Sequence, residues 1–171
     1  ALEVAMAVEH GADEVDIVLN VGRMLTGEYD AAANEVEVIR TEMDDDVVLK
    51  VIIESGALKT PELIRKASLL SMLAGADFVK TSTGKIDVAA TPEAAVVMCQ
   101  AIRDYYDKTG RKVGFKAAGG VRTAEDAALY YTIVEEILGK EWLTTELFRI
   151  GASSAANNIL SAIEGSEVKY F

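Results

Sequence analysis

Five short apolar stretches of this chain each contain one charged residue, at intervals of 30 to 36 residues: Asp16, Lys50, Lys80, Lys116 and Arg149. A charged side chain inside a β-branched run costs free energy to bury unless it is paired or used. Five in series predict a shared interior lined with functional groups. The interval is also the length of one strand plus one covering helix, so each charge belongs to its own βα unit.

An internal repeat supports this interpretation. The segments Gly11–Asp16 and Gly75–Lys80 share the pattern Gly-Ala-Asp-x-Val-charge. Asp16 and Lys80 therefore occupy equivalent places in two units of the same kind. Self-similarity of this sort favours a (β/α) barrel over an irregular α/β sheet.

The lysines indicate amine chemistry. A lysine attacks a carbonyl only as the neutral amine, and a second ammonium nearby together with a dry surrounding lowers the pKa of that amine. Lys80 and Lys116 on adjacent strands could form such a pair, in which one makes a Schiff base while the other keeps it neutral. Asp16 would then move protons. The residues leave a second interpretation open, in which the aspartate and the two lysines form an ion network that only closes the barrel.

Two glycine-containing segments have the character of a phosphate site. Gly119 and Gly120 follow one predicted strand, and Gly151 with Ser153 and Ser154 follows the next. Barrel enzymes often bind phosphate with the loops after their last two strands, through backbone N–H groups and a helix N-terminus. Glycine lets the backbone approach the ligand, and the serine hydroxyls are donors. The pair of segments therefore favours a phosphorylated ligand.

The expected elements alternate strictly between strand and helix, which implies parallel strands joined by right-handed crossovers. Strand parity places the charged residues on the inward face, near the carboxyl ends of their strands, where barrel enzymes keep their chemistry. Strands are predicted over residues 14–19, 47–54, 77–82, 112–117 and 147–151, and helices over residues 1–10, 28–43, 60–74, 91–108, 123–138 and 153–164.

The composition of the chain excludes some classes of binding partner. The formal charge of −11 and the pI near 4.6 argue against nucleic acid or an anionic membrane, because both need a basic surface. His10 and Cys99 are the only histidine and cysteine, so a transition-metal site is not expected.

Without a leader or a long apolar span, we expect a cytoplasmic protein. We also expect one domain over residues 1–171, and the opening inside a helical pattern suggests the C-terminal part of something longer.

At several of these residues the chain resembles deoxyribose-phosphate aldolase. The segments that carry the resemblance are Ala76–Lys85, Gly114–Thr123, Arg149–Ser154, Gly11–Asp16 and Lys50–Glu54, and it extends to about residue 160. It implies an α/β fold of the (β/α)₈ TIM-barrel family, here an incomplete barrel of about five parallel βα units. It also implies a class I, metal-independent lyase that needs no cofactor. Such enzymes cleave 2-deoxy-D-ribose 5-phosphate to glyceraldehyde 3-phosphate and acetaldehyde.

The resemblance also implies a role for individual residues. Lys80 would form the Schiff base, Lys116 would be the lysine that tunes it, and Asp16 would relay protons. A homo-oligomer is compatible with the family, and Tyr170 is a candidate for a catalytic tyrosine in the C-terminal tail. Thr83 and Lys85 would contact the small phosphorylated sugar, and its phosphate would be held by Gly119, Gly120, Gly151, Ser153 and Ser154.

Two departures from the family pattern stand out. Ala117 replaces a proline, so we expect a looser loop before the two glycines. The chain also covers five of the eight strands, so we expect little or no turnover from it alone, since five strands cannot close a barrel that keeps water out. We expect Lys50 to face inward as a partner of Asp16 or Glu54 that supports the site rather than reacting.

Two alternative functions remain. One is another Schiff-base barrel, a transaldolase-like protein acting on a phosphorylated ketose. The run Lys80–Lys85 favours the deoxyribose-phosphate enzyme over it. The other is an inactive half-barrel that serves as a fragment or an assembly element, because an open five-strand sheet exposes its edges.

Overall fold

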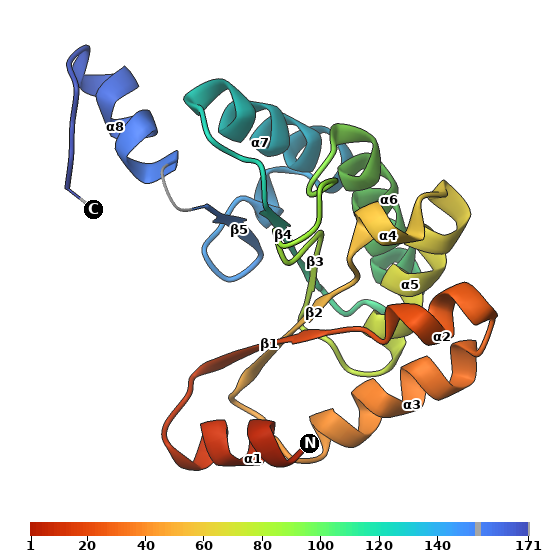
Figure 1. The fold of residues 1–171 in the computed structure, drawn as a ribbon. Helices are drawn as coiled ribbons and strands as arrows, with labels where there is room; N and C mark the ends of the chain where they lie inside the picture. Colours follow the sequence, from red (N-terminus) through yellow and green to blue (C-terminus); the bar gives the residue numbers. More distant parts are fainter. Residues whose placement is uncertain (153–154, 171) are drawn as a thin grey trace.

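Five parallel strands form one sheet in the computed structural model, which describes residues 1–152 and 155–170. They follow one another in the sheet in chain order, so each βα unit adds one strand beside the last (Figure 1). This confirms the predicted parallel arrangement. The strands are β1 (Glu14–Val18), β2 (Val48–Ile52), β3 (Phe78–Lys80), β4 (Gly114–Ala118) and β5 (Phe148–Gly151).

The helices lie mainly on one side of this sheet, where α3, α5, α6 and α7 pack side by side (Figure 1). Threonine side chains cap α5, α6 and α7 at their first turns, as the Thr-Pro and Thr-Ala-Glu-Asp segments predict. The helices are α1 (Leu2–Glu9), α2 (Val21–Thr26), α3 (Tyr29–Arg40), α4 (Ser55–Leu58), α5 (Pro61–Leu73), α6 (Pro92–Thr109), α7 (Ala124–Leu138), the 3₁₀ helix η1 (Lys140–Trp142) and α8 (Ala155–Glu164).

The hydrophobic core lies between the sheet and these helices. Every second residue of the inner strands points into it, and Leu49, Val51, Val79, Phe115 and Ala117 have no exposed surface. The alternation of side chains along a strand therefore sends the charged residues to the opposite, concave face. The prediction from strand parity is confirmed.

The concave face has an aromatic floor. The ring of Phe78 lies directly over Gly114, since a Cβ on this glycine would approach Phe78 Cε1 to 2.3 Å. The guanidinium of Arg149 lies 5.7 Å from the centre of the same ring. The registers pair Phe78 with Gly114, and Lys80 with Lys116 two residues further on. The two lysines thus stand next to the floor on the side toward the carboxyl ends of the strands.

The structure differs from the sequence prediction mainly at the ends of elements. β3 ends at Lys80, two residues early, because the hydroxyls of Thr81 and Ser82 bond the backbone carbonyl of Ala118. The short helices α2, α4 and η1 were not predicted. Few residues and little periodicity mark such turns in a sequence.

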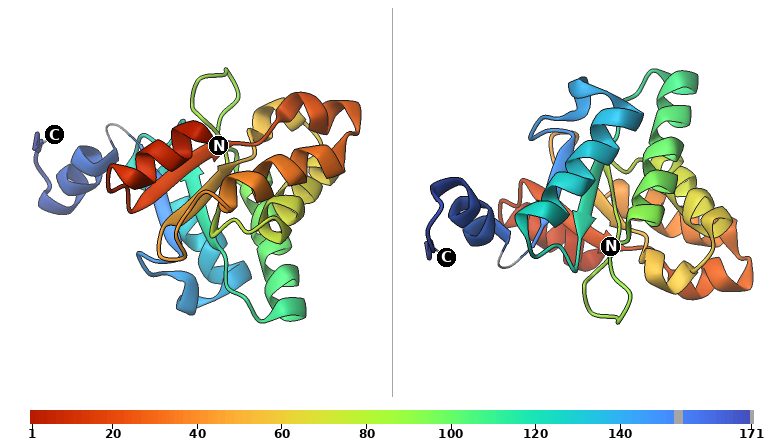
Figure 2. Two further views of the ribbon diagram at one scale, coloured as in Figure 1. Left: turned by 90° about the horizontal axis from the view of Figure 1, so that it is seen from below. Right: turned by 90° about the horizontal axis from the view of Figure 1, so that it is seen from above.

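The connection between β3 and α6 extends as a loop beyond the rest of the molecule (Figure 2). At the other end of the chain, α8 follows β5 and contacts α7 at one edge of the molecule (Figure 1). Among residues 1–152 and 155–170, no helix is long and apolar enough to cross a membrane.

A methyl group at position 114 tests the aromatic floor. Gly114→Ala should destabilise the chain by roughly 1 to 3 kcal/mol, because the new Cβ has no room beside the Phe78 ring. Urea unfolding measures the change. Gly22→Ala is the matched control, since its Cβ finds an ordinary 3.4 Å contact inside α2 and should be neutral or stabilising. Equal midpoints for Gly114→Ala and the wild type would show that the ring does not occupy this position.

Candidate active site

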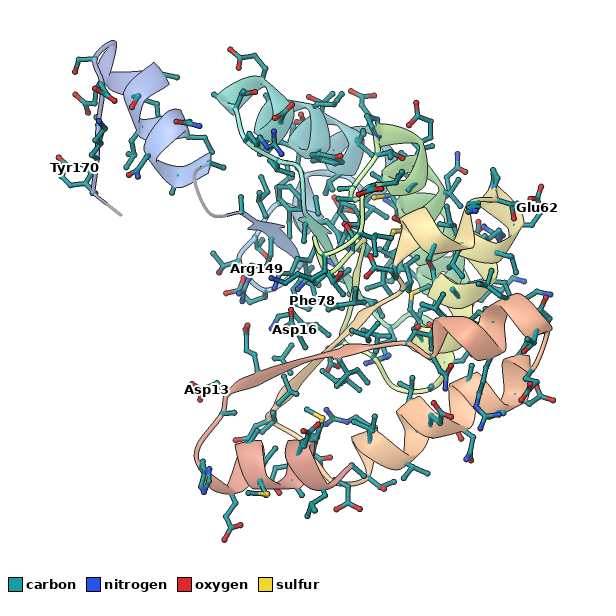
Figure 3. All side chains as sticks on the ribbon, in the orientation of Figure 1. Asp13, Asp16, Glu62, Phe78, Arg149 and Tyr170 are labelled. Carbon is teal, nitrogen blue, oxygen red and sulfur yellow. The ribbon has the colours of Figure 1, made fainter. Side chains whose placement is uncertain are left out.

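One carboxylate on β1 contacts lysines of three other strands on the concave face. Asp16 Oδ2 accepts a hydrogen bond from Lys80 Nζ at 2.7 Å and from Lys116 Nζ at 2.8 Å. Its other oxygen, Oδ1, lies 3.1 Å from Lys50 Nζ. Figure 3 shows Asp16 among the side chains in the middle of the molecule. The structure confirms that Asp16, Lys80 and Lys116 lie together, and that Lys50 faces inward as a partner of Asp16.

A second carboxylate links the two outermost strands of the sheet. Glu14 on β1 contacts Lys50 Nζ at 2.6 Å and the guanidinium of Arg149 on β5 at 2.9 Å. Hydrogen bonding to Lys50, assisted by Arg149, holds the pKa of Glu14 below its ordinary value, although burial acts in the opposite direction. The sequence did not predict this pair. It shows that the sheet curves enough for side chains of its first and last strands to meet.

Burial and the lysines act against each other on Asp16. Burial raises its pKa, but the hydrogen bonds from Lys116, Lys80 and Lys50 together outweigh burial and hold that pKa well below the ordinary value. Burial lowers the pKa of Lys116, and the nearby carboxylate of Asp16 only partly offsets this. The Asp16 side chain is 25% exposed, and those of Lys80 and Lys116 are 14% and 18% exposed.

A cavity of about 520 Å³ opens beside the two lysines. Thr83, Lys85, Gly119, Gly120 and Gly151 line it, so the structure brings these predicted contacts to the same place as the lysine pair. The predicted phosphate contacts Ser153 and Ser154 lie outside the described residues. Further lining residues are Lys80, Gly84, Lys116, Ala118, Val121, Arg122 and Ala152.

Arg122 is a lining residue that the sequence analysis did not assign. It follows Gly119 and Gly120, two consecutive glycines with φ of +81° and +84°, which side-chain-bearing residues rarely adopt. The amide groups of Arg122 and Thr123 both donate to Asp126, so this carboxylate already occupies the first turn of α7. Any phosphate held by this loop would therefore meet the glycine amides and the Arg122 charge rather than the end of α7.

The expectation of a loose loop at Ala117 is wrong. Ala117 lies inside β4, is paired with Ile150 of β5 and has no exposed surface. The sheet holds this residue in place, so a fixed proline φ is not needed there.

Tyr170 does not reach the site in this structure. Its side chain is 76% exposed, and its backbone N–H donates to Asn157 Oδ1. Figure 3 places Tyr170 beyond α8, far from Asp16. The hypothesis of a catalytic tyrosine gains no support from this position.

The arrangement can carry out imine chemistry. Two amines share one carboxylate oxygen, and both line a cavity that three glycines and an arginine also line. An amine of this kind can add to a carbonyl, and the adjacent carboxylate can accept and return protons. Within the described residues, no group of three or more His, Cys, Asp and Glu side chains is placed to hold a metal ion.

Comparison with known proteins identifies relatives over most of the chain. A family model described as DeoC/LacD family aldolase matches residues 1–157. The deoxyribose-phosphate aldolases of Mus musculus and Homo sapiens are 50% and 48% identical over 157 residues. The match takes in 92% of this chain and 49% of each relative, so the chain spans about half the length of these relatives.

Solved structures of similar proteins superpose on most of this chain. A Coccidioides immitis protein provisionally assigned as a deoxyribose-phosphate aldolase superposes with a TM-score of 0.78 at 31% identity, over 95% of this chain and 57% of that one. The deoxyribose phosphate aldolase of Aeropyrum pernix, described as tetrameric, gives 0.69 at 26% identity, over 95% and 60%.

Replacing the shared carboxylate should change the acid stability of the chain. The folded pKa of Asp16 lies below its ordinary value near 3.8, so its contribution to stability is present above that value and is lost as the pH falls through the lower folded pKa. Asp16→Asn should therefore unfold with a shallower pH dependence below about pH 4, and should cost roughly 1 to 3 kcal/mol at neutral pH because the lysines lose a charged acceptor.

The midpoint of urea unfolding, measured at neutral pH and at several acidic pH values, tests this prediction. Asp13→Asn is the matched control, because Asp13 is exposed and points away from the cluster (Figure 3). Parallel pH profiles for Asp16→Asn and the wild type would refute the role of the carboxylate in holding the lysines.

Proposed function

We propose that this chain, which belongs to the DeoC/LacD family of aldolases, carries the reacting groups of a deoxyribose-phosphate aldolase. The observation that carries the proposal is the single oxygen of Asp16 that bonds both Lys80 and Lys116 at the wall of the cavity. The chain spans only about half of its mouse and human relatives, so the activity of the complete enzyme is part of the proposal.

The proposed reaction begins at Lys80. Its neutral amine adds to the aldehyde carbon of open-chain 2-deoxyribose 5-phosphate, and loss of water with uptake of one proton leaves a protonated imine. A base removes the proton of the hydroxyl on the third carbon, the bond between the second and third carbons breaks, and its electrons pass to the imine as an enamine. Glyceraldehyde 3-phosphate leaves, the enamine takes up a proton, and water releases acetaldehyde from the lysine.

Asp16 is suited to the proton steps of this scheme. It contacts both lysines directly, so a proton can pass between the amines and the carboxylate without a long water chain. It is ionised at neutral pH, so it accepts hydrogen bonds from both amines. Lys50 contacts the other oxygen of the same carboxylate, and Glu14 contacts Lys50, so both residues are assigned a supporting role.

The choice of Lys80 over Lys116 rests on the sequence run Lys80–Lys85, which resembles the family's Schiff-base segment. Both amines line the cavity, and burial lowers the pKa of Lys116. Position alone therefore favours neither lysine as the nucleophile, and the lowered pKa of Lys116 does not favour Lys80. The same run favours the deoxyribose-phosphate enzyme over a transaldolase-like protein.

The proposed partner is a small phosphorylated sugar, with no cofactor, nucleic acid or membrane, in the cytoplasm. The glycines that line the cavity, Gly119, Gly120 and Gly151, let a ligand approach the backbone, and with the charge of Arg122 they support a phosphate there. The tetramer described for the Aeropyrum pernix relative supports a homo-oligomer.

Reductive trapping tests the nucleophile. Borohydride with acetaldehyde should add one ethyl group to Lys80 and not to Lys116, because reduction of the imine leaves a stable secondary amine. The protein is a chimaera in which the mouse relative supplies the part that this chain does not cover. Peptide mass mapping locates the adduct, and Lys80→Arg should abolish it. An adduct on Lys116, or normal turnover by Lys80→Arg, would sink the assignment.

Removing the second amine tests how the pair works. Lys116→Leu removes the neighbouring ammonium group that, in the proposed pair, favours the neutral amine needed for attack on the carbonyl. Cleavage rates from pH 6 to 10 should therefore fall steeply at neutral pH and recover in part at alkaline pH. A uniform loss at every pH would count against a tuning role for Lys116.

A further inference from the structure

Glu54 occupies an unusual position just beyond the end of β2. It has φ of +53° and ψ of +59°, a left-handed conformation that residues other than glycine and asparagine rarely adopt. Its side chain is buried, with 6% of the residue exposed. The backbone on either side is fixed to the end of β3, through Ile53 N–H to the Lys80 carbonyl at 3.0 Å and Ser55 N–H to the Thr81 carbonyl at 2.9 Å.

The buried carboxylate of Glu54 is directed at one residue of the cavity wall. Glu54 Oε2 accepts a 2.5 Å hydrogen bond from Thr83 Oγ1, and Oε1 accepts a 3.2 Å bond from the Thr83 backbone N–H. Thr83 lies on the cavity wall with Lys85, whereas Glu54 is not a lining residue. Glu54 therefore acts on the cavity only through Thr83.

These bonds decide which way the Thr83 hydroxyl can interact. A hydroxyl has one hydrogen and two lone pairs, and a carboxylate only accepts. The single hydrogen is committed to Glu54, and one lone pair accepts the Lys85 backbone N–H at 3.1 Å. The remaining lone pair of Thr83 Oγ1 is available to a ligand. The hydroxyl can therefore accept a hydrogen bond from a ligand but cannot donate one.

The rest of the loop between β3 and α6 is fastened at two further points, which keeps Thr83 from turning away. A Cβ on Gly56 of α4 would lie 2.0 Å from the Val88 carbonyl oxygen, so the loop rests directly on that glycine. The Ala90 N–H donates to the Gly119 carbonyl at 3.2 Å. The loop that contains Thr83 and Lys85 is therefore joined to the proposed phosphate loop by the hydrogen bond from Ala90 to Gly119.

We propose that Glu54 is a positioning residue that presents Thr83 as a hydrogen-bond acceptor to a donor group of the ligand. This inference rests on the proposed function for the identity of that ligand. The proposed substrate extends from the lysine pair to the glycine amides, and Thr83 lines the same cavity together with Lys85. The donor is then the hydroxyl on the fourth carbon of the sugar, the one that takes no part in bond cleavage.

Glu54→Gln reverses the polarity of Thr83 with the smallest change of shape. The amide oxygen can still accept the Thr83 backbone N–H, but its NH₂ group donates to the hydroxyl oxygen. The Thr83 hydrogen is then free to point into the cavity. Glu62→Gln is the matched control, since Glu62 is an exposed residue of α5 far from Asp16 (Figure 3).

The kinetic test uses the same chimaera in the direction of synthesis, with acetaldehyde and two acceptor aldehydes. One acceptor is glyceraldehyde 3-phosphate, and the other lacks the hydroxyl next to its carbonyl. The wild type and Glu62→Gln should prefer the hydroxyl-bearing acceptor in kcat/KM by roughly tenfold, the value of one hydrogen bond. Glu54→Gln should lose most of this preference, mainly through a higher KM for that acceptor.

Thr83→Val keeps Glu54 and removes the hydroxyl, so it should lose the same preference even if a Glu54 variant folds poorly. The double variant should be no worse than Thr83→Val alone. An unchanged preference in a folded Glu54→Gln or in Thr83→Val would overturn the inference.

Amide hydrogen exchange in the 171-residue chain separates this inference from the proposed function, because it needs no turnover. Glu54→Ala should speed exchange of the Thr83 amide at least tenfold, whereas Glu54→Gln should leave it protected. Failure of wild-type turnover would count against the proposed function alone. Unchanged exchange in Glu54→Ala would overturn the positioning role whatever the enzyme does.

Discussion

The arrangement of the concave face depends on one shared carboxylate. Three lysine amines meet at Asp16, and two of them bond the same oxygen, so without this charge three ammonium groups would repel one another in a partly buried space. With Glu14 and Arg149 the cluster holds two acidic and four basic side chains. Basic side chains outnumber acidic ones in this cluster, so the cavity beside it is suited to an anionic ligand.

The cluster in turn requires a particular shape of sheet. Asp16 on β1 can contact Lys116 on β4 only if the sheet curves round its concave face, and the contact between Glu14 and Arg149 joins its first and last strands in the same way. The apolar residues of the opposite face fix that curvature by packing under the helices. The ring of Phe78 on Gly114 fills the bottom of the hollow, so the amines rest on an apolar surface.

Sequence periodicity was enough to predict the strands, their order and the face on which each charge lies, because alternation along a strand is a local property. It also predicted Lys50 as an inward-facing partner of Asp16 or Glu54, and the structure shows Lys50 opposite Asp16 on the neighbouring strand and in contact with it. The pair of Glu14 and Arg149 was missed because it depends on the curvature of the whole sheet. The hydrogen bonds from Thr83 to Glu54 were missed because no nearby residue in the sequence indicates that the backbone of Glu54 adopts a left-handed conformation.

The coupling of the two lysines by Asp16 can be measured by NMR titration of the lysine side chains. Signals of Lys80 and Lys116 would be followed with pH in the wild type and in Asp16→Asn. With this coupling, Lys116 should titrate below its ordinary range in the wild type and lower still in Asp16→Asn, because burial then acts without the compensating carboxylate. The Lys80 signal should respond when Lys116 titrates. Lysine signals that titrate independently and ignore the loss of Asp16 would contradict this coupling.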